Sequence, residues 1–315
     1  MTETIPDTPG RPAPAGYRGR PVFILAPARS FSTVVTALLG GHPDIYAFPE
    51  MQVFSAATVG DFLDKARREP NAKPAYIHVR LSGVYRAVAQ VHEGDQSDEA
   101  VARAIAWLRL RSGWPMTQLM NHLLELVAPR TGLEKSPETI ATDEALAACI
   151  KAYPLARYIH LTRHPVDTQR SMQQNHQPSL IKPLPEKALI AVAASAWYQG
   201  HARALRTLNG LPPGRWIRVR GEDVLREPRT WLPRILGWLG LACDDEVIEG
   251  MLHTERWEFG GTGPSSKLFG GDPKFFLSPA LRPVLASGPV CFDPSWCLPE
   301  EMSRRMTALA HDLGY

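Results

Sequence analysis

The segment that most constrains the fold is a run of four apolar residues, Val22–Leu25, which a loop and a helical pattern follow directly. A strand without polar residues is typical of a parallel sheet whose two faces are both covered. Pro27 lacks the backbone N–H that a sheet ladder needs, so the strand has to end before it. We expect strands at Val22–Ala26, Leu133–Lys135, Tyr158–Thr162 and Trp216–Val219.

Longer helical patterns separate these runs, and the alternation predicts an α/β fold of three layers, with a central, mostly parallel sheet flanked by helices. From Arg256 to Pro294 the pattern gives way to Gly, Pro, Ser and aromatic residues, and such long loops tend to carry function. We interpret residues 21–315 as one domain and residues 1–20, rich in Pro, Thr and Gly, as a disordered leader. The predicted helices are Ser32–Leu39, Ser97–Arg111, Met116–Val127, Glu138–Lys151, Pro165–Gln174, Glu186–Leu208, Thr230–Leu239, Glu246–Leu252 and Pro299–Leu313.

Composition argues against several classes of function. The formal net charge is only +3 and the basic residues are scattered, which argues against a nucleic-acid binder and suits a protein with one anion-binding pocket. No apolar run is long enough to span a bilayer. The four cysteines form no CxxC pair and have no histidine at zinc-finger spacing, so we expect no metal site and a reducing, cytoplasmic setting.

The loop after the first strand has the composition of an anion site. It carries Arg29, Ser30, Ser32 and Thr33 where a helix begins, without a GxxxxGK[ST] or GxGxxG pattern. A helix N-terminus presents unpaired N–H groups and the positive end of its dipole, and arginine and hydroxyl side chains add donors. The alternative is an ordinary helix with Ser30 or Ser32 as its N-cap and a surface arginine.

A second site of the same kind follows the strand Tyr158–Thr162. Arg163 stands at the carboxyl end of that strand, and Ser171 lies eight residues further on, about two turns into the next helix. Ligands of open α/β sheets bind at the carboxyl ends of the strands. Two such groups on two strands predict one ligand with two separated phosphate-like groups.

Three stretches, APARSFST, RHPVDTQRS and RGEDVLREP, resemble in their order the motifs of the PAPS-dependent sulfotransferases, where PAPS is 3′-phosphoadenosine-5′-phosphosulfate. HPDIYAFPE and LEKSP are similar to segments of the bacterial members. The resemblance covers nearly all of the chain after Gly19 and implies a P-loop NTPase-like sulfotransferase fold and sulfuryl transfer to an acceptor hydroxyl. It assigns Arg29, Ser30, Ser32 and Thr33 to the 5′-phosphosulfate, Arg163 and Ser171 to the 3′-phosphate, and Lys267, in KLFGGDPKFF, to a position closing over the 3′-phosphate.

The chain departs from the family pattern at two places. Phe31 stands where the first loop usually has glycine, and a positive φ is costly for phenylalanine, so we expect a slightly different loop. No aromatic residue precedes the Glu-Asp pair in RGEDV, so a tyrosine that would stack on adenine is missing at Arg220–Gly221. Trp197 is a substitute, although its place on an apolar helix face is more typical of the core.

The resemblance also directs the search for a general base. The animal cytosolic members use a histidine two residues after a strand-end lysine, which here is Lys135, but Pro137 stands in place of that histidine. A glutamate is the base in tyrosylprotein and several bacterial members, and Glu50 matches its position. We therefore expect catalysis by Glu50 as base, with Lys135 and Arg29 stabilising charge; a carboxylate beside a helix start and a solvated lysine are the alternatives. His160, His164 and His176 are competing bases.

Two other functions stay open. A kinase or other phosphoryl transferase would need a lysine in the first loop and a carboxylate for Mg²⁺, and neither is evident. Pro137 and Phe31 also fit a module that binds the nucleotide without catalysis. The acceptor, a small molecule, lipid or sugar, is not readable, because the aromatic residues that would line its cleft also suit the core: Phe48, Phe54, Trp107, Trp114 and the loop Phe269–Phe276.

Overall fold

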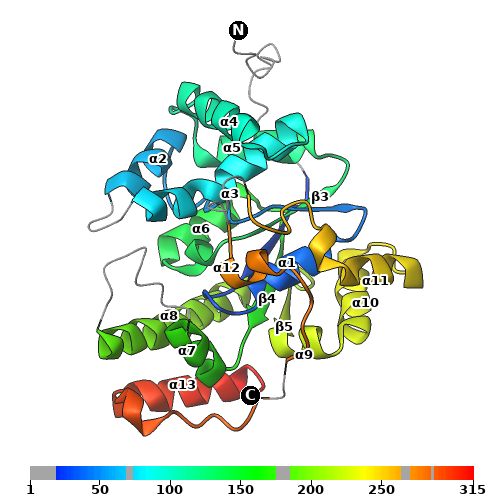
Figure 1. The fold of residues 1–315 in the computed structure, drawn as a ribbon. Coiled ribbons are helices and arrows are strands. Elements are labelled where there is room, and N and C mark those ends of the chain that lie inside the picture. Colours follow the sequence, from blue (N-terminus) through cyan, green and yellow to red (C-terminus); the bar gives the residue numbers. More distant parts are fainter. Residues whose placement is uncertain (1–18, 69–73, 175–184, 264–269, 285–286) are drawn as a thin grey trace.

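The computed structural model describes residues 19–68, 74–174, 185–263, 270–284 and 287–315. The sheet has five parallel strands in the order β2-β3-β1-β4-β5. It lies at the centre of the molecule, among the helices (Figure 1). This confirms the predicted α/β class with a parallel sheet flanked by helices. The strands are β1 (Val22–Leu25), β2 (Ile45–Ala47), β3 (Thr131–Lys135), β4 (Arg157–Thr162) and β5 (Trp216–Arg220).

Parallel pairing brings the carboxyl ends of the strands to one edge of the sheet. β1 lies between β3 and β4, with Ile24 opposite Lys135 and Leu25 opposite His160. The loops that leave β1, β3 and β4 therefore start next to one another. In open α/β sheets this edge is where ligands bind.

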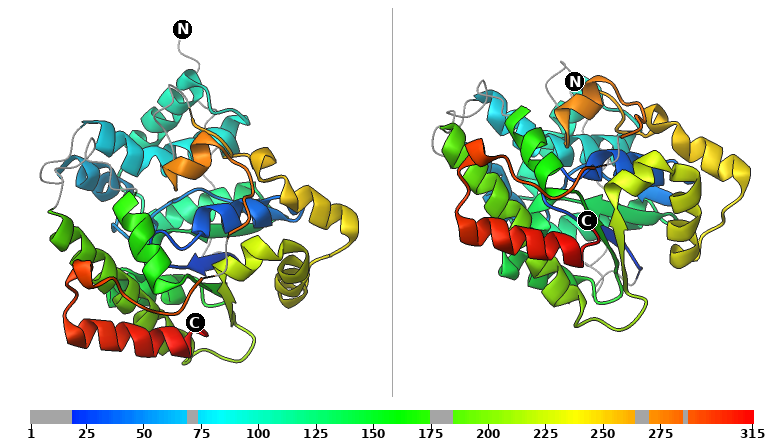
Figure 2. Two further views of the ribbon diagram at one scale, coloured as in Figure 1. Left: turned by 60° about the horizontal axis from the view of Figure 1, so that its bottom comes forward. Right: turned by 90° about the horizontal axis from the view of Figure 1, so that it is seen from below.

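Helices cover both faces of the sheet (Figures 1 and 2). Across the sheet, the connection from β1 to β2 runs one way, and the connections from β3 to β4 and from β4 to β5 run the other way. Because such crossovers are right-handed, the helices of these two sets of connections lie on opposite faces of the sheet. One face carries α1 (Ser32–Gly40), α9 (Gly221–Arg226), α10 (Pro228–Leu239) and α11 (Asp245–Leu252). The other carries α6 (Asp143–Ala152), α7 (Pro165–Gln174), α8 (Glu186–Leu208) and α13 (Glu300–Asp312).

A third group of helices lies between β2 and β3 in the sequence and forms the top of Figure 1. The group consists of α2 (Val59–Arg68), α3 (Pro74–Glu93), α4 (Asp98–Leu110) and α5 (Met116–Leu126).

Within the described ranges, no helix combines the length and the apolar composition needed to cross a membrane.

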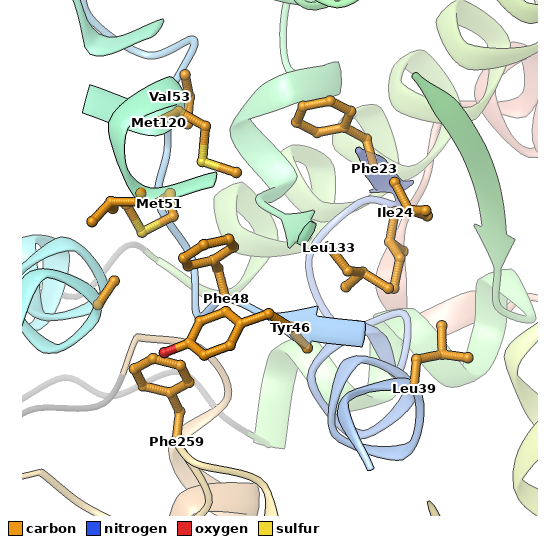
Figure 3. Packing of buried hydrophobic residues seen from close by; sticks show 14 of the residues in the cluster. Phe23, Ile24, Leu39, Tyr46, Phe48, Met51, Val53, Met120, Leu133 and Phe259 are labelled. Carbon is orange, nitrogen blue, oxygen red and sulfur yellow. The ribbon is translucent and has the colours of Figure 1, made fainter. Parts of the chain in front are cut away.

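The core joins distant segments through aromatic contacts (Figure 3). The ring of Tyr46 lies 4.8 Å from that of Phe48 and 6.2 Å from that of Phe259, which comes from the C-terminal part of the chain. Burial of these rings anchors the C-terminal segment against the sheet. Of the aromatic residues considered for an acceptor cleft, Phe48, Trp107 and Phe276 are buried in the core, Phe54 and Trp114 pack against it, and Phe275 is buried beside the cavity described below.

Several elements differ from the prediction. β2 has only three residues and follows a turn, too short a run to show a strand pattern. α2 and α3 were not predicted; in the structure they pack against each other and against α4 and α5. The helix expected from Glu138 begins at Asp143, because a 3-10 turn (Pro137–Ile140) precedes it and Thr142 caps it through the Ala145 N–H. The segment 256–294 contains the short helix α12 (Pro273–Leu277).

Candidate active site

A cavity of about 470 Å³ opens at the carboxyl edge of the sheet. The loop after β1, the segment after β4, α7 and the C-terminal segment around α12 all contribute to its wall. Its lining includes Arg29, Ser30, Glu50, Arg163 and Ser171. Residues assigned to two separate anion sites in the sequence therefore share one cavity.

The first loop reaches the cavity through two residues in the left-handed conformation. Arg29 has φ of 69° and Phe31 has φ of 61°. Alternation of this kind turns backbone N–H groups toward one concave side, a known form of anion site. Phe31 itself is the N-cap of α1 and makes no side-chain capping bond, so the alternative of a helix capped by Ser30 or Ser32 is wrong. The buried Oγ of Ser30 has no hydrogen-bond partner and lies in the cavity wall.

Both arginines make contacts that join the two anion sites. Arg29 Nε donates to Ser171 Oγ at 3.2 Å. Arg163 Nη1 donates to the backbone oxygen of Arg29 at 2.7 Å. These bonds place the two guanidinium groups in a common cleft.

Lys135 and Glu50 form an ion pair at the end of β3. Lys135 Nζ lies 2.5 Å from Glu50 Oε1 and donates to Thr33 Oγ1 at 2.8 Å. The lysine side chain is 1% exposed and that of Glu50 is 21% exposed, so the carboxylate is the member of the pair that reaches the cavity. The alternative of a solvated strand-end lysine is wrong, because both of its polar contacts lie inside the protein.

Glu134 supports Glu50 from the other side of β3. Its Oε1 accepts hydrogen bonds from the Met51 N–H at 3.1 Å and from the Ser136 hydroxyl, and Ser136 Oγ in turn accepts from the Gln52 N–H at 2.8 Å. Burial raises the pKa of Glu134 from 4.5 to about 7. The alternation of side chains along a strand could have flagged this residue, since it must point away from Lys135.

Asp272 was not predicted as a site residue. Its carboxylate lies 2.7 Å from Arg29 Nη1, and its N–H donates to Thr33 Oγ1 at 3.1 Å. Gly271 permits this approach, since a Cβ there would stand 3.0 Å from Thr33 Oγ1. The Gly-Gly-Asp-Pro turn was the visible signal, but nothing local indicates contact with the first loop.

Two further cations of the C-terminal segment, Lys274 and Arg282, line the cavity. Lys267, the residue proposed to close over the 3′-phosphate, lies outside the described residues. His176, one of the competing bases, also lies outside them. Across the described ranges, no cluster of three or more His, Cys, Asp or Glu side chains is arranged to hold a metal ion.

A buried network holds the backbone at Arg163. Trp197 Nε1 donates to the Arg163 carbonyl at 2.9 Å, and the tryptophan is 1% exposed, so it is a core residue and not a surface for adenine. The His164 N–H donates to Glu222 at 2.8 Å, and the Tyr315 hydroxyl donates to the same carboxylate at 3.1 Å. Burial raises the pKa of Glu222.

The competing histidines are enclosed. His160 is fully buried, and its Nε2 lies 2.9 Å from Nδ1 of His201. The strand carrying it has helices on both faces, so no face of it is open. Burial lowers the pKa of His160 to about 3 and the pKa of His164 below its usual value. His164 is 2% exposed and does not line the cavity.

Comparison with known proteins identifies structures of the same fold. The chain is similar to the sulfotransferase domain of the Synechococcus PCC 7002 olefin synthase, with a TM-score of 0.73 and 24% sequence identity. The alignment covers 98% of this chain and 99% of that domain. The sulfotransferase domain from the curacin biosynthetic pathway covers 94% and 98%, with a TM-score of 0.71 and 21% identity. These likenesses show the fold, and a search of curated proteins gave no match. The model of the sulfotransferase family matches residues 21–245, well over half of the sequence, and the chain belongs to that family.

Proposed function

We propose that this sulfotransferase uses PAPS as donor and transfers its sulfuryl group to a hydroxyl of a small-molecule, lipid or carbohydrate acceptor. The convergence of Arg29 and Arg163 in one cavity carries the proposal. Ser30 Oγ and Arg163 Nε are buried without hydrogen-bond partners, and buried polar groups are seldom left so. Phosphate and sulfate oxygens would satisfy both. When bound, PAPS supplies an activated sulfuryl group.

The residues around the first loop fit the 5′ end of this donor. Ser30, Ser32 and Thr33 offer hydroxyl groups beside the N-terminus of α1, and Arg29 offers a planar pair of donors. Arg163 and Ser171 fit the 3′-phosphate by the same chemistry. Lys274 and Arg282 are the described cations of the C-terminal segment that can take the part first given to Lys267.

Glu50 fits the role of general base. Its carboxylate reaches the cavity, and the ion pair with Lys135 fixes its position beside Thr33. In this role Glu50 accepts the proton of the acceptor hydroxyl, while Lys135 and Arg29 stabilise the negative charge that develops on the leaving side. The enclosure of His160 and His164 supports Glu50 over the competing histidines.

The acceptor meets a wall of mixed polarity. Leu225, Phe275, Ala280 and Val284 line the cavity together with the polar groups. We extend the proposal to a cytoplasmic setting, which the four free cysteines support. The acceptor can be identified by incubating the protein and labelled PAPS with a cell extract and finding newly sulfated species by mass spectrometry.

The substitution Glu50→Gln tests the mechanism. With an acceptor from that screen, turnover should fall by about 10²–10⁴-fold, the usual contribution of a general base, while affinity for adenosine 3′,5′-bisphosphate changes little. Glu138→Gln, which removes another carboxylate from the cavity wall, is the matched control and should keep its turnover. Equal losses in both variants would assign the effect to the charge of the cavity. Nucleotide binding without any turnover in the wild type would favour a binding module.

A further inference from the structure

Phe31 holds a strained backbone at the centre of the first loop. Its φ of 61° is a left-handed conformation that glycine adopts freely and that costs other residues about 1–2 kcal/mol. Residues held in such conformations cluster at functional sites, where the surroundings impose them. The strain raises the question of what the phenylalanine ring does there.

The ring fills a slot between two loops of the site. The guanidinium carbon of Arg163 lies over its face, 4.0 Å from the ring centre. On another side the ring touches Gly221, where a Cβ would stand only 2.7 Å from Phe31 Cδ2. Both positions depart from the family pattern described above: an aromatic residue replaces glycine in the loop, and glycine stands where an aromatic residue is usual. The two departures match in space, since the ring needs the room that Gly221 leaves.

The ring is one of two described contacts that orient the guanidinium of Arg163. The other is the hydrogen bond from Nη1 to the Arg29 carbonyl. The Nε of Arg163 is buried without a hydrogen-bond partner, so this donor is not committed within the protein. A flat guanidinium held between a ring face and a carbonyl keeps its remaining donors in a fixed plane, ready for an anion.

We propose that Phe31 is a positioning residue, which holds Arg163 in the orientation that binds the 3′-phosphate of the donor, and that Gly221 is required to admit its ring. The inference rests on the proposed function, because Arg163 receives the 3′-phosphate only if the ligand is PAPS. It assigns a cause to the strained loop that the family pattern does not supply.

The test compares two nucleotides by calorimetry. Adenosine 3′,5′-bisphosphate has the 3′-phosphate and adenosine 5′-phosphosulfate lacks it. Phe31→Leu keeps an apolar side chain but removes the ring face, and should weaken binding of the bisphosphate about tenfold, the usual size of a buried cation–π contact. Binding of the phosphosulfate should change less than about twofold, and Phe31→Tyr should restore both affinities.

A second comparison separates positioning from general damage to the loop. In an Arg163→Ala background, Phe31→Leu should have no further effect on the bisphosphate, because the ring acts through the arginine. Gly221→Ala, whose Cβ would stand 2.7 Å from Phe31 Cδ2, displaces the ring by an independent route and should weaken binding of the bisphosphate in the wild-type background. Equal losses for both nucleotides, or additive losses in the double variant, would overturn the inference. A wild-type protein that binds neither nucleotide would overturn the proposed function itself, and this inference with it.

Discussion

Glu134 makes the stability of this protein depend on pH in a direction opposite to that of an ordinary carboxylate. The side chain is 1% exposed, and burial raises its pKa from 4.5 to about 7. Its Oε2 is buried without a hydrogen-bond partner, while Oε1 accepts from Met51 and Ser136. The substitution Glu134→Gln keeps the shape and the accepting oxygen, and it removes the charge.

The size of the effect follows from the two pKa values. Because the folded-state value is the higher one, the stabilisation is fully present below pH 4.5 and is lost as the pH rises through about 7. Raising the pH from 5 to 8 therefore lowers the free energy of unfolding of the wild type by about 2.5 kcal/mol through this one group. The free energy of unfolding of Glu134→Gln, relative to the wild type, should therefore increase by about 2.5 kcal/mol over this range.

Urea unfolding at several pH values between 5 and 8 measures this difference directly. Glu125→Gln, at an exposed position of α5, is the matched control and should show a constant offset from the wild type. Because the glutamine can still accept from the Met51 N–H, affinity for adenosine 3′,5′-bisphosphate should be preserved. The reasoning about burial would be refuted if the difference in the free energy of unfolding between Glu134→Gln and the wild type stayed constant, or became smaller, as the pH rises.

Two further changes give expected outcomes. The folded-state pKa of His160, about 3, lies below its unfolded value, so the wild type loses stability as the pH falls. The free energy of unfolding of His160→Gln relative to the wild type, measured with urea, should therefore rise by about 2 kcal/mol from pH 7 to pH 5. A loss at pH 5 would contradict the buried, neutral state seen beside His201. Asp272→Asn removes a negative charge from Arg29 and keeps the helix cap, so calorimetry should show about fivefold tighter binding of adenosine 5′-phosphosulfate. Weaker binding would mean that the carboxylate helps to hold the ligand.

The parts of the site that the sequence predicted are those governed by strand direction. Arg29 and Arg163 follow buried apolar strands, and parallel strands leave their carboxyl ends at one edge, so the convergence of the two arginines needed no knowledge of the packing. Lys135 and its neighbour Glu134 were separable by the alternation of side chains. The contacts that the sequence did not predict join segments distant along the chain. Examples are the ion pair between Asp272 and Arg29 and the hydrogen bond between His160 and His201.

The charges of the cavity are compensated unequally, and this bears on how a donor would bind. Arg29 is paired with Asp272 at 2.7 Å and Lys135 with Glu50 at 2.5 Å. Arg163 contacts a carbonyl and a ring, and among the described residues no carboxylate lies within the 4.0 Å of an ion pair with it. An anion at Arg163 therefore displaces no internal partner, whereas an anion at Arg29 has to compete with Asp272. Since forming a charge-assisted bond gains most where none has to be broken, the 3′-phosphate should supply the larger share of nucleotide affinity.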